Sequence, residues 1–424
     1  MPSTIWTIPA HGGNARQLTK VGEPAGGHGS PSWSPDGKRI VFGSYDPETT
    51  DIWTISAAGT DLKKIAVGVD PIYAPDGAHI YFASLLRSAN LNLGVSKIKV
   101  SENGDPQGEP VEIARTGSSR VKRLTITANG DALAYGALTT TSNLWSAPVS
   151  PLTNEAMGPP VALTRDTSHR ISSPSVSPDG KRIAYHVARV GTSADIWMID
   201  ANGANPTQLT TDPGSDIRPS WFPDGKQLIF LSRREGKDKL WTIDLPSGRE
   251  KPLLDIAQDM TFPQLSPDGK LILFNSKKSG TTNLWIVPTE GGEPKQLTFD
   301  KQTMGFGCWS PDGQFIAFEI KRGDDTHLGL IPASGGEPVQ LTFDRGQSWP
   351  HSFSPDGDKI AFAGFREGHW NVWWISRSTR TQKKLTNNSK LNTFVRYPSW
   401  SPRGYQIVYE YAETTGNIWL LELK

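Results

Sequence analysis

The sequence lacks several features that would place it outside the ordinary globular proteins. Its 424 residues include a single cysteine, Cys308, which excludes an internal disulfide but does not decide the compartment. No apolar run reaches the roughly 18 residues that a membrane-spanning helix needs, so we expect no membrane insertion by this chain. The segment from Met1 to Trp6 has no basic region followed by an apolar stretch, so we expect no signal peptide.

An excess of charge of one sign is also missing. Lys and Arg together number 44, and Asp and Glu together number 43. Nucleic-acid-binding domains carry a basic footprint, so no nucleic-acid partner is expected. The eight histidines include no pair at the spacing with which a helix presents metal ligands, and we expect neither a metal nor another cofactor.

What the sequence has in abundance is a repeated turn. The tetrapeptide Ser-Pro-Asp-Gly, or a close variant of it, occurs nine times at intervals of 40 to 53 residues. The copies begin at Ser34, Ala74, Thr127, Ser177, Phe222, Ser266, Ser310, Ser354 and Ser401. Periods in this range indicate a repeat architecture. In such a turn Pro pre-sets φ, Gly accepts a positive φ, and Asp bonds local backbone amides, so we interpret the recurring Asp as structural.

Each repeat predicts four short antiparallel strands. In the first repeat these are residues 31–33, 39–42, 51–55 and 62–65, which are rich in β-branched and aromatic residues and are separated by turn residues. The third strand repeats a polar-aliphatic-Trp signature, as in Asp51-Ile52-Trp53 and Asn417-Ile418-Trp419. Four antiparallel strands per repeat are typical of one blade of a β-propeller.

These motifs resemble those of a known family. The Trp-Ser-Pro-Asp-Gly-Lys hairpin at Trp33 to Lys38, followed by the Ile-Trp strand, is similar to the WD40-like PD40 repeat of TolB-type β-propellers. The resemblance covers essentially the whole chain and implies a propeller fold. It says little about function, because this propeller is joined to many different activities.

The count of turns predicts a single closed propeller of nine four-stranded blades over residues 1–424. A ring removes exposed strand edges when its first and last strands share one blade. We expect the segment 16–19 to complete a blade whose other strands lie in 399–423, because the C-terminal strand follows its own hairpin partner through a short loop. The alternative is that the N-terminus supplies both the third and fourth strands and displaces residues 417–423.

The loops that enter the inner strands vary from blade to blade, and binding residues sit preferentially on such loops. We therefore expect a partner at the variable-loop face, opposite the Ser-Pro-Asp-Gly turns. These linkers carry Phe262 and Met304 together with nine candidate binding residues of the kinds enriched in interface hot spots or able to bind metal. The nine are His28, Arg170, Arg218, Met260, Phe306, Trp349, His351, Arg396 and Tyr397.

The sequence has no Gly-x-Ser-x-Gly nucleophile elbow, so we expect no catalytic residues. We predict a monomeric, non-catalytic propeller that binds a protein, a peptide or a small ligand. It would be a sensor or scaffold domain of a larger bacterial protein, for example one carrying a serine/threonine kinase, and extracytoplasmic if that protein is exported or membrane-anchored. Two alternatives remain open. One is a uronide lyase that uses the channel mouth, with His28, His169 and His351 converging there. The other is a gating propeller separated from a serine peptidase.

Overall fold

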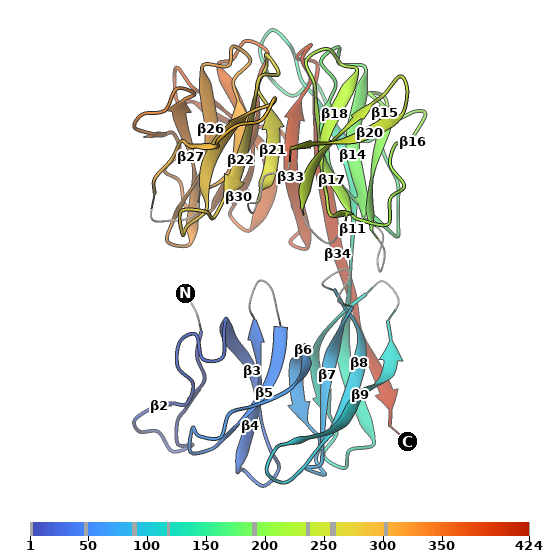
Figure 1. Ribbon diagram of the computed structural model, residues 1–424, viewed down its shortest axis with the longest axis vertical. Helices are drawn as coiled ribbons and strands as arrows, with labels where there is room; N and C mark the ends of the chain where they lie inside the picture. The colour runs from blue at the N-terminus through green and yellow to red at the C-terminus, as the bar shows by residue number, and fades with distance from the viewer. Residues whose placement is uncertain are drawn as a thin grey trace. The chain divides into compact units, whose positions relative to one another are not determined.

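The computed structural model describes residues 3–45, 50–86, 91–116, 119–188, 193–234, 238–254, 260–300 and 304–423. These residues form β-strands and turns without an α-helix, which confirms the all-β class. Nothing in the described ranges is a helix long and apolar enough to cross a membrane. The chain divides into two compact units (Figure 1). Unit 1 comprises residues 1–140 and 414–424, and unit 2 comprises residues 141–413.

Unit 2 is built from six antiparallel blades. Four are separate four-stranded sheets, and a larger sheet contributes two more. The first blade contains β13 (Arg170–Val176), β14 (Arg182–Ala188), β15 (Ala194–Asp200) and β16 (Thr207–Gln208). The next two contain β17 (Asp216–Trp221), β18 (Gln227–Ser232), β19 (Lys239–Asp244), β20 (Arg249–Leu254), β21 (Thr261–Leu265), β22 (Leu271–Ser276), β23 (Asn283–Pro288) and β24 (Lys295–Gln296).

The fourth and fifth blades contain β25 (Met304–Trp309), β26 (Phe315–Arg322), β27 (Asp325–Pro332), β28 (Val339–Gln340), β29 (Gln347–Phe353), β30 (Lys359–Arg366), β31 (His369–Ser376) and β32 (Gln382–Lys384). The sixth blade combines β33 (Thr393–Trp400) and the first half of β34 (Gln406–Glu422) with the last half of β11 (Ala132–Pro148) and β12 (Val161–Ala162).

The innermost strands of these six blades form a closed ring. Each of β13, β17, β21, β25, β29 and β33 contacts the next, and β33 returns to β13. Unit 2 is therefore a six-bladed propeller, which lies within the usual range of four to eight blades.

Unit 1 consists of a half-blade followed by three blades. The half-blade pairs β1 (Trp6–Thr7) with β2 (Arg16–Gln17). The next two blades contain β3 (Gly27–Trp33), β4 (Arg39–Tyr45), β5 (Thr50–Ser56), β6 (Lys63–Tyr73), β7 (His79–Leu86), β8 (Leu91–Val100) and β9 (Pro106–Arg115), with β6 shared between them. The last blade has three strands, which are β10 (Arg120–Ile126), the first half of β11 and the last half of β34.

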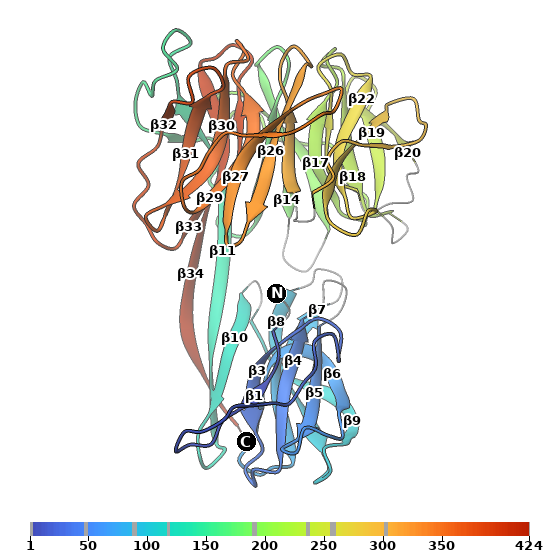
Figure 2. The ribbon, with the colours of Figure 1, turned by 90° about the vertical axis from the view of Figure 1, so that its left-hand side faces the viewer.

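The expected nine-bladed ring is not confirmed, and the expected closing strand is wrong. Residues 16–17 pair with residues 6–7 of the half-blade, not with residues 399–423. The sixth blade of unit 2 instead takes its third strand from Asn143-Leu144-Trp145, and the last blade of unit 1 takes its third strand from Asn417-Ile418-Trp419. Figure 2 shows β11 and β34 as long uninterrupted strands. The third and ninth repeats have therefore exchanged their third strands.

A sequence difference accompanies this exchange. In the sixth, seventh and eighth repeats a Gly with a positive φ lies between the second and third strands and permits the chain to reverse, namely Gly280 (94°), Gly323 (63°) and Gly368 (83°). The third repeat has Thr139-Thr140-Thr141 at this place, and the ninth has Glu413-Thr414-Thr415 before Gly416, which is not among the glycines with a positive φ. Thr favours extended backbone, so both segments continue as strands of 17 residues.

The hydrophobic core lies between adjacent blades, and one of its aromatic residues recurs at a fixed distance from each turn. The aromatic residue eight positions after the start of each turn is Phe42, Phe82, Phe230, Phe274, Phe318 or Phe362, and each of these is at most 1% exposed. Tyr135, Tyr185 and Tyr409 take this position in the other three repeats and are also buried. The aromatic ring on the second strand is therefore the main filler of each blade.

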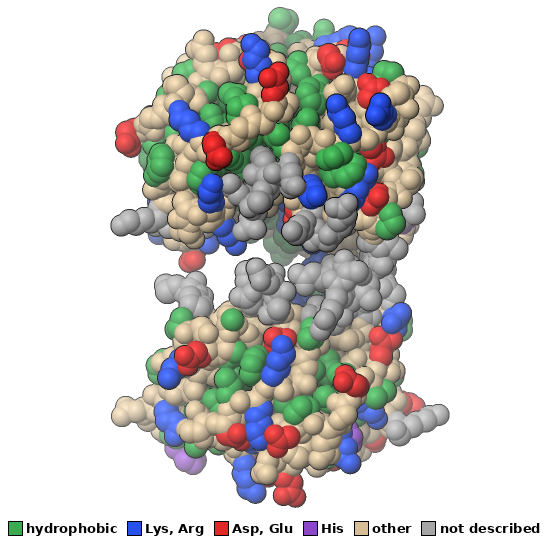
Figure 3. Space-filling view, viewed as in Figure 1, with side chains coloured by type: hydrophobic (Ala, Val, Ile, Leu, Met, Phe, Trp, Pro, Cys, Tyr) green, Lys and Arg blue, Asp and Glu red, His purple; other side chains and the backbone are tan. Residues whose placement is uncertain are grey.

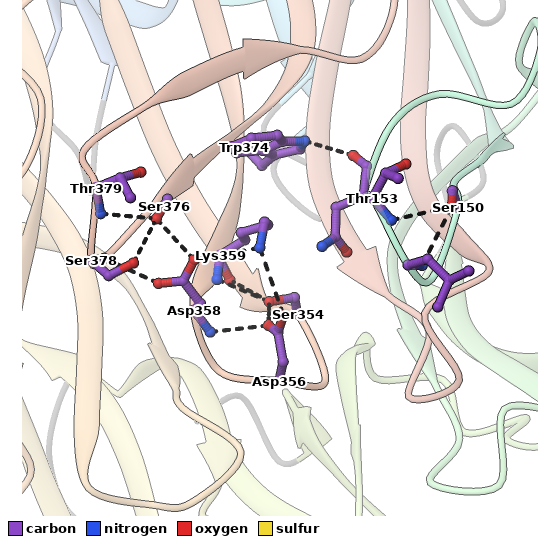
Figure 4. Close-up of polar contacts among 12 residues, drawn as sticks. Ser150, Thr153, Ser354, Asp356, Asp358, Lys359, Trp374, Ser376, Ser378 and Thr379 are labelled. Carbon is purple, nitrogen blue, oxygen red and sulfur yellow. Dashed lines mark hydrogen bonds and ion pairs between the residues drawn. The ribbon is translucent and has the colours of Figure 1, made fainter.

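The repeated turn has the structural role that the sequence predicted. In the fifth blade of unit 2 (Figure 4), Asp356 accepts hydrogen bonds from the Ser354 hydroxyl and from the backbone N–H of Asp358, the latter at 3.1 Å. Asp358 in turn accepts hydrogen bonds from Ser376 Oγ at 2.8 Å and from the backbone N–H of Ser378 at 3.0 Å. These carboxylates therefore join the turn to β31.

This network predicts an acid-sensitive contribution to stability. Partial burial favours the neutral acid, but the hydrogen bonds from Ser378 and Ser376 prevail and lower the pKa of Asp358 from 3.8 to about 2. The stabilisation is thus present above about pH 4 and is lost as the pH falls toward 2. In thermal melts over this range, the wild type should lose more stability than Asp358→Asn, whereas the exposed-loop control Asp324→Asn should follow the wild type. Parallel curves for Asp358→Asn and the wild type would refute this role.

Candidate functional site

The innermost strands of unit 2 share an unusual backbone feature. Each has a register shift against its second strand, which marks a β-bulge. In five blades the residue four positions before the turn has a positive φ, and these residues are Ser173 (54°), Arg218 (59°), Phe262 (55°), Phe306 (39°) and Tyr397 (52°). Such conformations cost about 1–3 kcal/mol each and cluster at functional sites, and bulges re-aim side chains.

The bulged side chains meet inside the ring. The rings of Phe262 and Tyr397 come from opposite blades, and their centroids lie 6.5 Å apart. Phe306 lies 4.4 Å from Phe262 and 6.2 Å from Tyr397, while His351 lies 4.9 Å from both Phe306 and Tyr397. The Arg218 guanidinium carbon lies 3.3 Å from the Phe262 ring centroid. We call these five residues the channel cluster, and contacts between opposite blades mean that the cluster crosses the channel.

A cavity of about 560 Å³ adjoins the channel cluster on the side of the repeated turns. Four cluster residues line it, namely Arg218, Phe262, His351 and Tyr397, together with Ser173. Its wall includes prolines of five turns, Pro178, Pro223, Pro267, Pro311 and Pro402. We call this cavity the funnel. It lies toward the turn face, whereas the sequence analysis expected a partner at the opposite, variable-loop face.

The funnel contains a cation without a partner. Arg218 makes no ion pair with the described residues, and its buried Nη1 has no hydrogen-bond partner among them. Burial lowers the pKa of Arg218, but an arginine remains charged at neutral pH. Burial also lowers the pKa of His351 to about 3, so this histidine is neutral. The funnel therefore holds one positive charge, and leaving such a charge uncompensated is costly.

Three more polar atoms of the funnel residues are unsatisfied. Ser173 Oγ, His351 Nε2 and Trp309 Nε1 are buried and find no hydrogen-bond partner in the described part of the chain. Buried polar groups in proteins are nearly always paired, so each exception calls for an explanation. Together with Arg218 these atoms offer hydrogen-bonding groups and one positive charge to a polar, anionic ligand.

At the corresponding position in unit 1, the polar groups form hydrogen bonds with one another. There the bulged residues are Ser30, Asp70 and Arg123, again with positive φ. Ser30 Oγ donates to Asp70 at 2.7 Å, and the Arg123 backbone N–H donates to the other oxygen of Asp70 at 3.4 Å. Since these polar groups bond one another, unit 2 provides the better candidate site.

The predicted site residues divide into three groups. The structure brings Arg218, Phe306, His351 and Tyr397 together in the channel cluster. Trp349 and Arg396 adjoin it, because the Trp349 ring lies 5.6 Å from Phe306 and the Arg396 guanidinium lies 5.8 Å from Trp349. Arg170, Met260 and His28 lie elsewhere.

Each of these last three residues has a structural role. Arg170 Nε binds Glu410 Oε1 at 3.1 Å, and this ion pair links the sixth blade to the first. Met260 is 4% exposed and packs in the core between blades. His28 belongs to unit 1, is buried, and contacts Thr19 Oγ1 and the Pro24 carbonyl at 2.8 Å each.

The sequence analysis missed other members of the site. Phe262 was noted in a linker but not ranked as a candidate, although it supports the Arg218 guanidinium. Ser173 was not noted at all. A usable signal was present, because the residue four positions before each turn is the bulged one, and a large or charged residue there marks the channel.

Of the three histidines that the lyase alternative would bring to the channel mouth, the structure places only His351 at the channel. His28 is in unit 1, whereas His351 is in the funnel and His169 is on a loop, where its Nδ1 lies 2.7 Å from Asp166 Oδ2. Ser168 Oγ contacts the same nitrogen at 3.0 Å, so these residues cannot act as a catalytic triad, which uses both ring nitrogens. Within the described ranges, no group of three or more His, Cys, Asp or Glu could hold a metal ion.

The surface charge agrees with the balanced composition. Figure 3 shows basic and acidic side chains interspersed on the face that it draws of each unit. A basic stripe of the kind that binds nucleic acid does not appear on that face.

Comparison with known proteins identifies the repeat. Residues 161–256 match the model of the PD40 repeat, described as the TolB beta propeller domain. The Tol-Pal system protein TolB of Anaeromyxobacter dehalogenans is 47% identical over 45 residues, which are 11% of this chain and 10% of that protein. Dipeptidyl-peptidase 5 of Porphyromonas endodontalis is 27% identical over 229 residues, which are 49% of this chain and 30% of that protein.

A solved structure shares the fold. The crystal structure of TolB from Acinetobacter baumannii superimposes with a TM-score of 0.50 and 18% identity, covering 84% of this chain and 81% of that one. The chain spans less than a third of the length of each of the two curated relatives named above. The recurrent turns, the four-stranded blades and these matches together support a TolB-type β-propeller family for this chain, with the PD40 repeat itself matched over residues 161–256.

Proposed function

We propose that this chain is a non-catalytic binding propeller whose funnel in unit 2 receives a carboxylate-bearing segment of a protein or peptide. The observation that carries the proposal is the Arg218 guanidinium at the floor of the funnel, which makes no ion pair with the described residues and whose Nη1 has no hydrogen-bond partner among them. A carboxylate accepts two parallel hydrogen bonds from a guanidinium and neutralises its charge. Within a larger protein, such a propeller would act as a sensor or scaffold.

The dimensions of the funnel support a small, extended ligand. Its volume of about 560 Å³ lies within the usual range of ligand sites, about 300–1,000 Å³. The channel cluster blocks the way through the ring, so a ligand entering from the turn face ends at Arg218. An acidic side chain or a chain terminus would reach the guanidinium, while neighbouring residues contact the prolines and Tyr397.

A second candidate function uses the same site. The match to a dipeptidyl-peptidase over about half of this chain favours a propeller that admits peptides to a catalytic domain. The funnel would then select peptides, and cleavage would need residues outside the channel cluster. This candidate shares the binding step and differs in whether bound peptide is cleaved.

The proposal can be tested with two labelled hexapeptide pools that have amidated C-termini and no acidic residue at the random positions, one with Glu fixed at the third position and the other with Gln. We expect the Glu pool to bind at least about thirtyfold more tightly, which corresponds to about 2 kcal/mol. Mass spectrometry of the recovered peptides should show them intact. Equal binding of the two pools would refute the carboxylate site, and cleaved peptides would refute the non-catalytic assignment.

A further inference from the structure

On the third strand of a blade, the aliphatic residue and the Trp of the repeated signature face opposite neighbouring blades. Ile52 packs in a cluster with Ile80 and Phe82 of the following blade, whereas Trp53 packs with Ile5 and Leu18 of the preceding half-blade. The same holds in unit 2, where Leu284 clusters with Trp309 and Phe318 of the next blade. The aliphatic residue of the signature thus faces forward and the Trp faces backward.

Nearly every forward-facing residue is buried by the blade that follows. Ile52, Leu144, Ile196, Leu240, Leu284, Leu328 and Val372 are at most 2% exposed. Ile418 has the same place in the repeat but is 85% exposed. Two neighbours on this forward face are also exposed, Leu420 at 68% and Leu138 at 37%. We call these three residues the Ile418 face.

The other end of unit 1 exposes the complementary surface. In the half-blade, Ile5 faces forward onto the first full blade and is 5% exposed. The residues that alternate with it, Trp6 and Ile8, face backward and are 55% and 62% exposed. We call these two residues the Trp6 face. Unit 1 therefore has a backward face on one side and a forward face on the other, and neither packs against another blade of the described residues.

We propose that two copies of this chain associate head to tail through unit 1, the Ile418 face of each packing on the Trp6 face of the other. The contact would reproduce the blade junction that recurs throughout the chain, with an aliphatic side chain on one side and a Trp on the other. Two copies make this contact twice about a twofold axis, so the ring closes and neither face stays exposed.

The number of blades that two copies of unit 1 supply is compatible with a closed ring. Unit 1 supplies three blades and a half-blade, so two copies supply about seven blades, within the four to eight of known propellers. The open strand edge of β34 over residues 415–422 lies at the same end, where the described residues provide no fourth strand, and such edges favour association. The resulting dimer departs from the monomer expected from the sequence. It rests on unit 1 alone and is independent of the funnel.

The test is sedimentation velocity of the full chain over a concentration series. We expect a species of twice the 46.3 kDa of one chain. Ile418→Asp and Trp6→Asp should each weaken the dimer by at least about thirtyfold. Leu152→Asp, a change at a 91% exposed site in unit 2, should leave it intact. A wild type that stays monomeric, or a dimer that tolerates Ile418→Asp, would overturn the proposal, and open-ended polymers would overturn the closed ring.

Cysteine cross-linking tests the direction of the contact. The native Cys308 is 2% exposed, so introduced cysteines react selectively. A mixture of the Trp6→Cys and Ile418→Cys proteins should cross-link with a short bifunctional maleimide, whereas mixing either with Leu152→Cys should not. Cross-links within the Trp6→Cys protein alone would show a head-to-head contact, and cross-links within one chain of the double variant would show an intramolecular contact. Either result would overturn the proposal.

Discussion

Replacing Arg218 with methionine is expected to stabilise the protein and to weaken ligand binding. The substitution keeps an unbranched stem of similar size over the Phe262 ring but removes a charge that has no ion-pair partner among the described residues. Replacing buried charged groups with apolar residues is often stabilising by about 1–4 kcal/mol. Loss of the carboxylate partner should weaken binding of the Glu peptide pool at least about thirtyfold.

The opposite signs of these two effects make the experiment informative. Denaturant unfolding should move the midpoint upward, while fluorescence titration shows the loss of binding. Arg345→Met is the matched control, because Arg345 is an exposed arginine of unit 2, and surface substitutions change stability by about 0.5 kcal/mol or less. A destabilised Arg218→Met protein that still binds the Glu pool would show that Arg218 has a structural role.

Truncating one of the repeated aromatic residues should produce the largest loss of stability. Phe318 is fully buried and packs with Leu284 and Ile286 of the preceding blade. Phe318→Ala removes this contact and leaves a cavity, and such changes cost about 3–5 kcal/mol. We expect the unfolding midpoint of unit 2 to fall accordingly, without a change in the composition of the peptides recovered by the remaining folded protein.

The exposed Phe343, at 76% exposure in the same unit, provides the control. Phe343→Ala should have the same unfolding midpoint as the wild type, because little apolar surface is lost from the core. If both variants were equally stable, the second-strand aromatic residues would not be the main filler of the blades.

Much of the fold could be predicted from the sequence, because short strands and turns are local features. The turn that begins at Ser34 and the strands around Trp53 lie where their residue pattern predicted them. Ring closure was not predictable in this way. It depends on whether segments such as Thr139-Thr140-Thr141 reverse or continue, and the count of repeats is the same in both cases. The threonine runs in those segments, which favour extended backbone, were the available signal.

The residues of the site were predicted only in part, and the reason differs from that for the fold. Residue type marked Arg218, Phe306, His351 and Tyr397 as candidates, since aromatic and arginine side chains are frequent in binding surfaces. Their convergence depends on positive φ at bulges, a conformation that Arg, Phe and Tyr rarely adopt. Burial of His28 in unit 1 could not be inferred either, because it results from contacts with Thr19 and Pro24 that form only in the folded unit.

The most direct test of the funnel is a double-mutant cycle between Arg218 and the ligand carboxylate. One peptide selected from the Glu pool and its Gln counterpart would be titrated into the wild type and into Arg218→Met, and calorimetry would give four binding free energies. The account predicts a coupling energy of about 1.5–3 kcal/mol, typical of a hydrogen bond to a charged group. A coupling energy near zero would contradict it, because the carboxylate would then bind without Arg218.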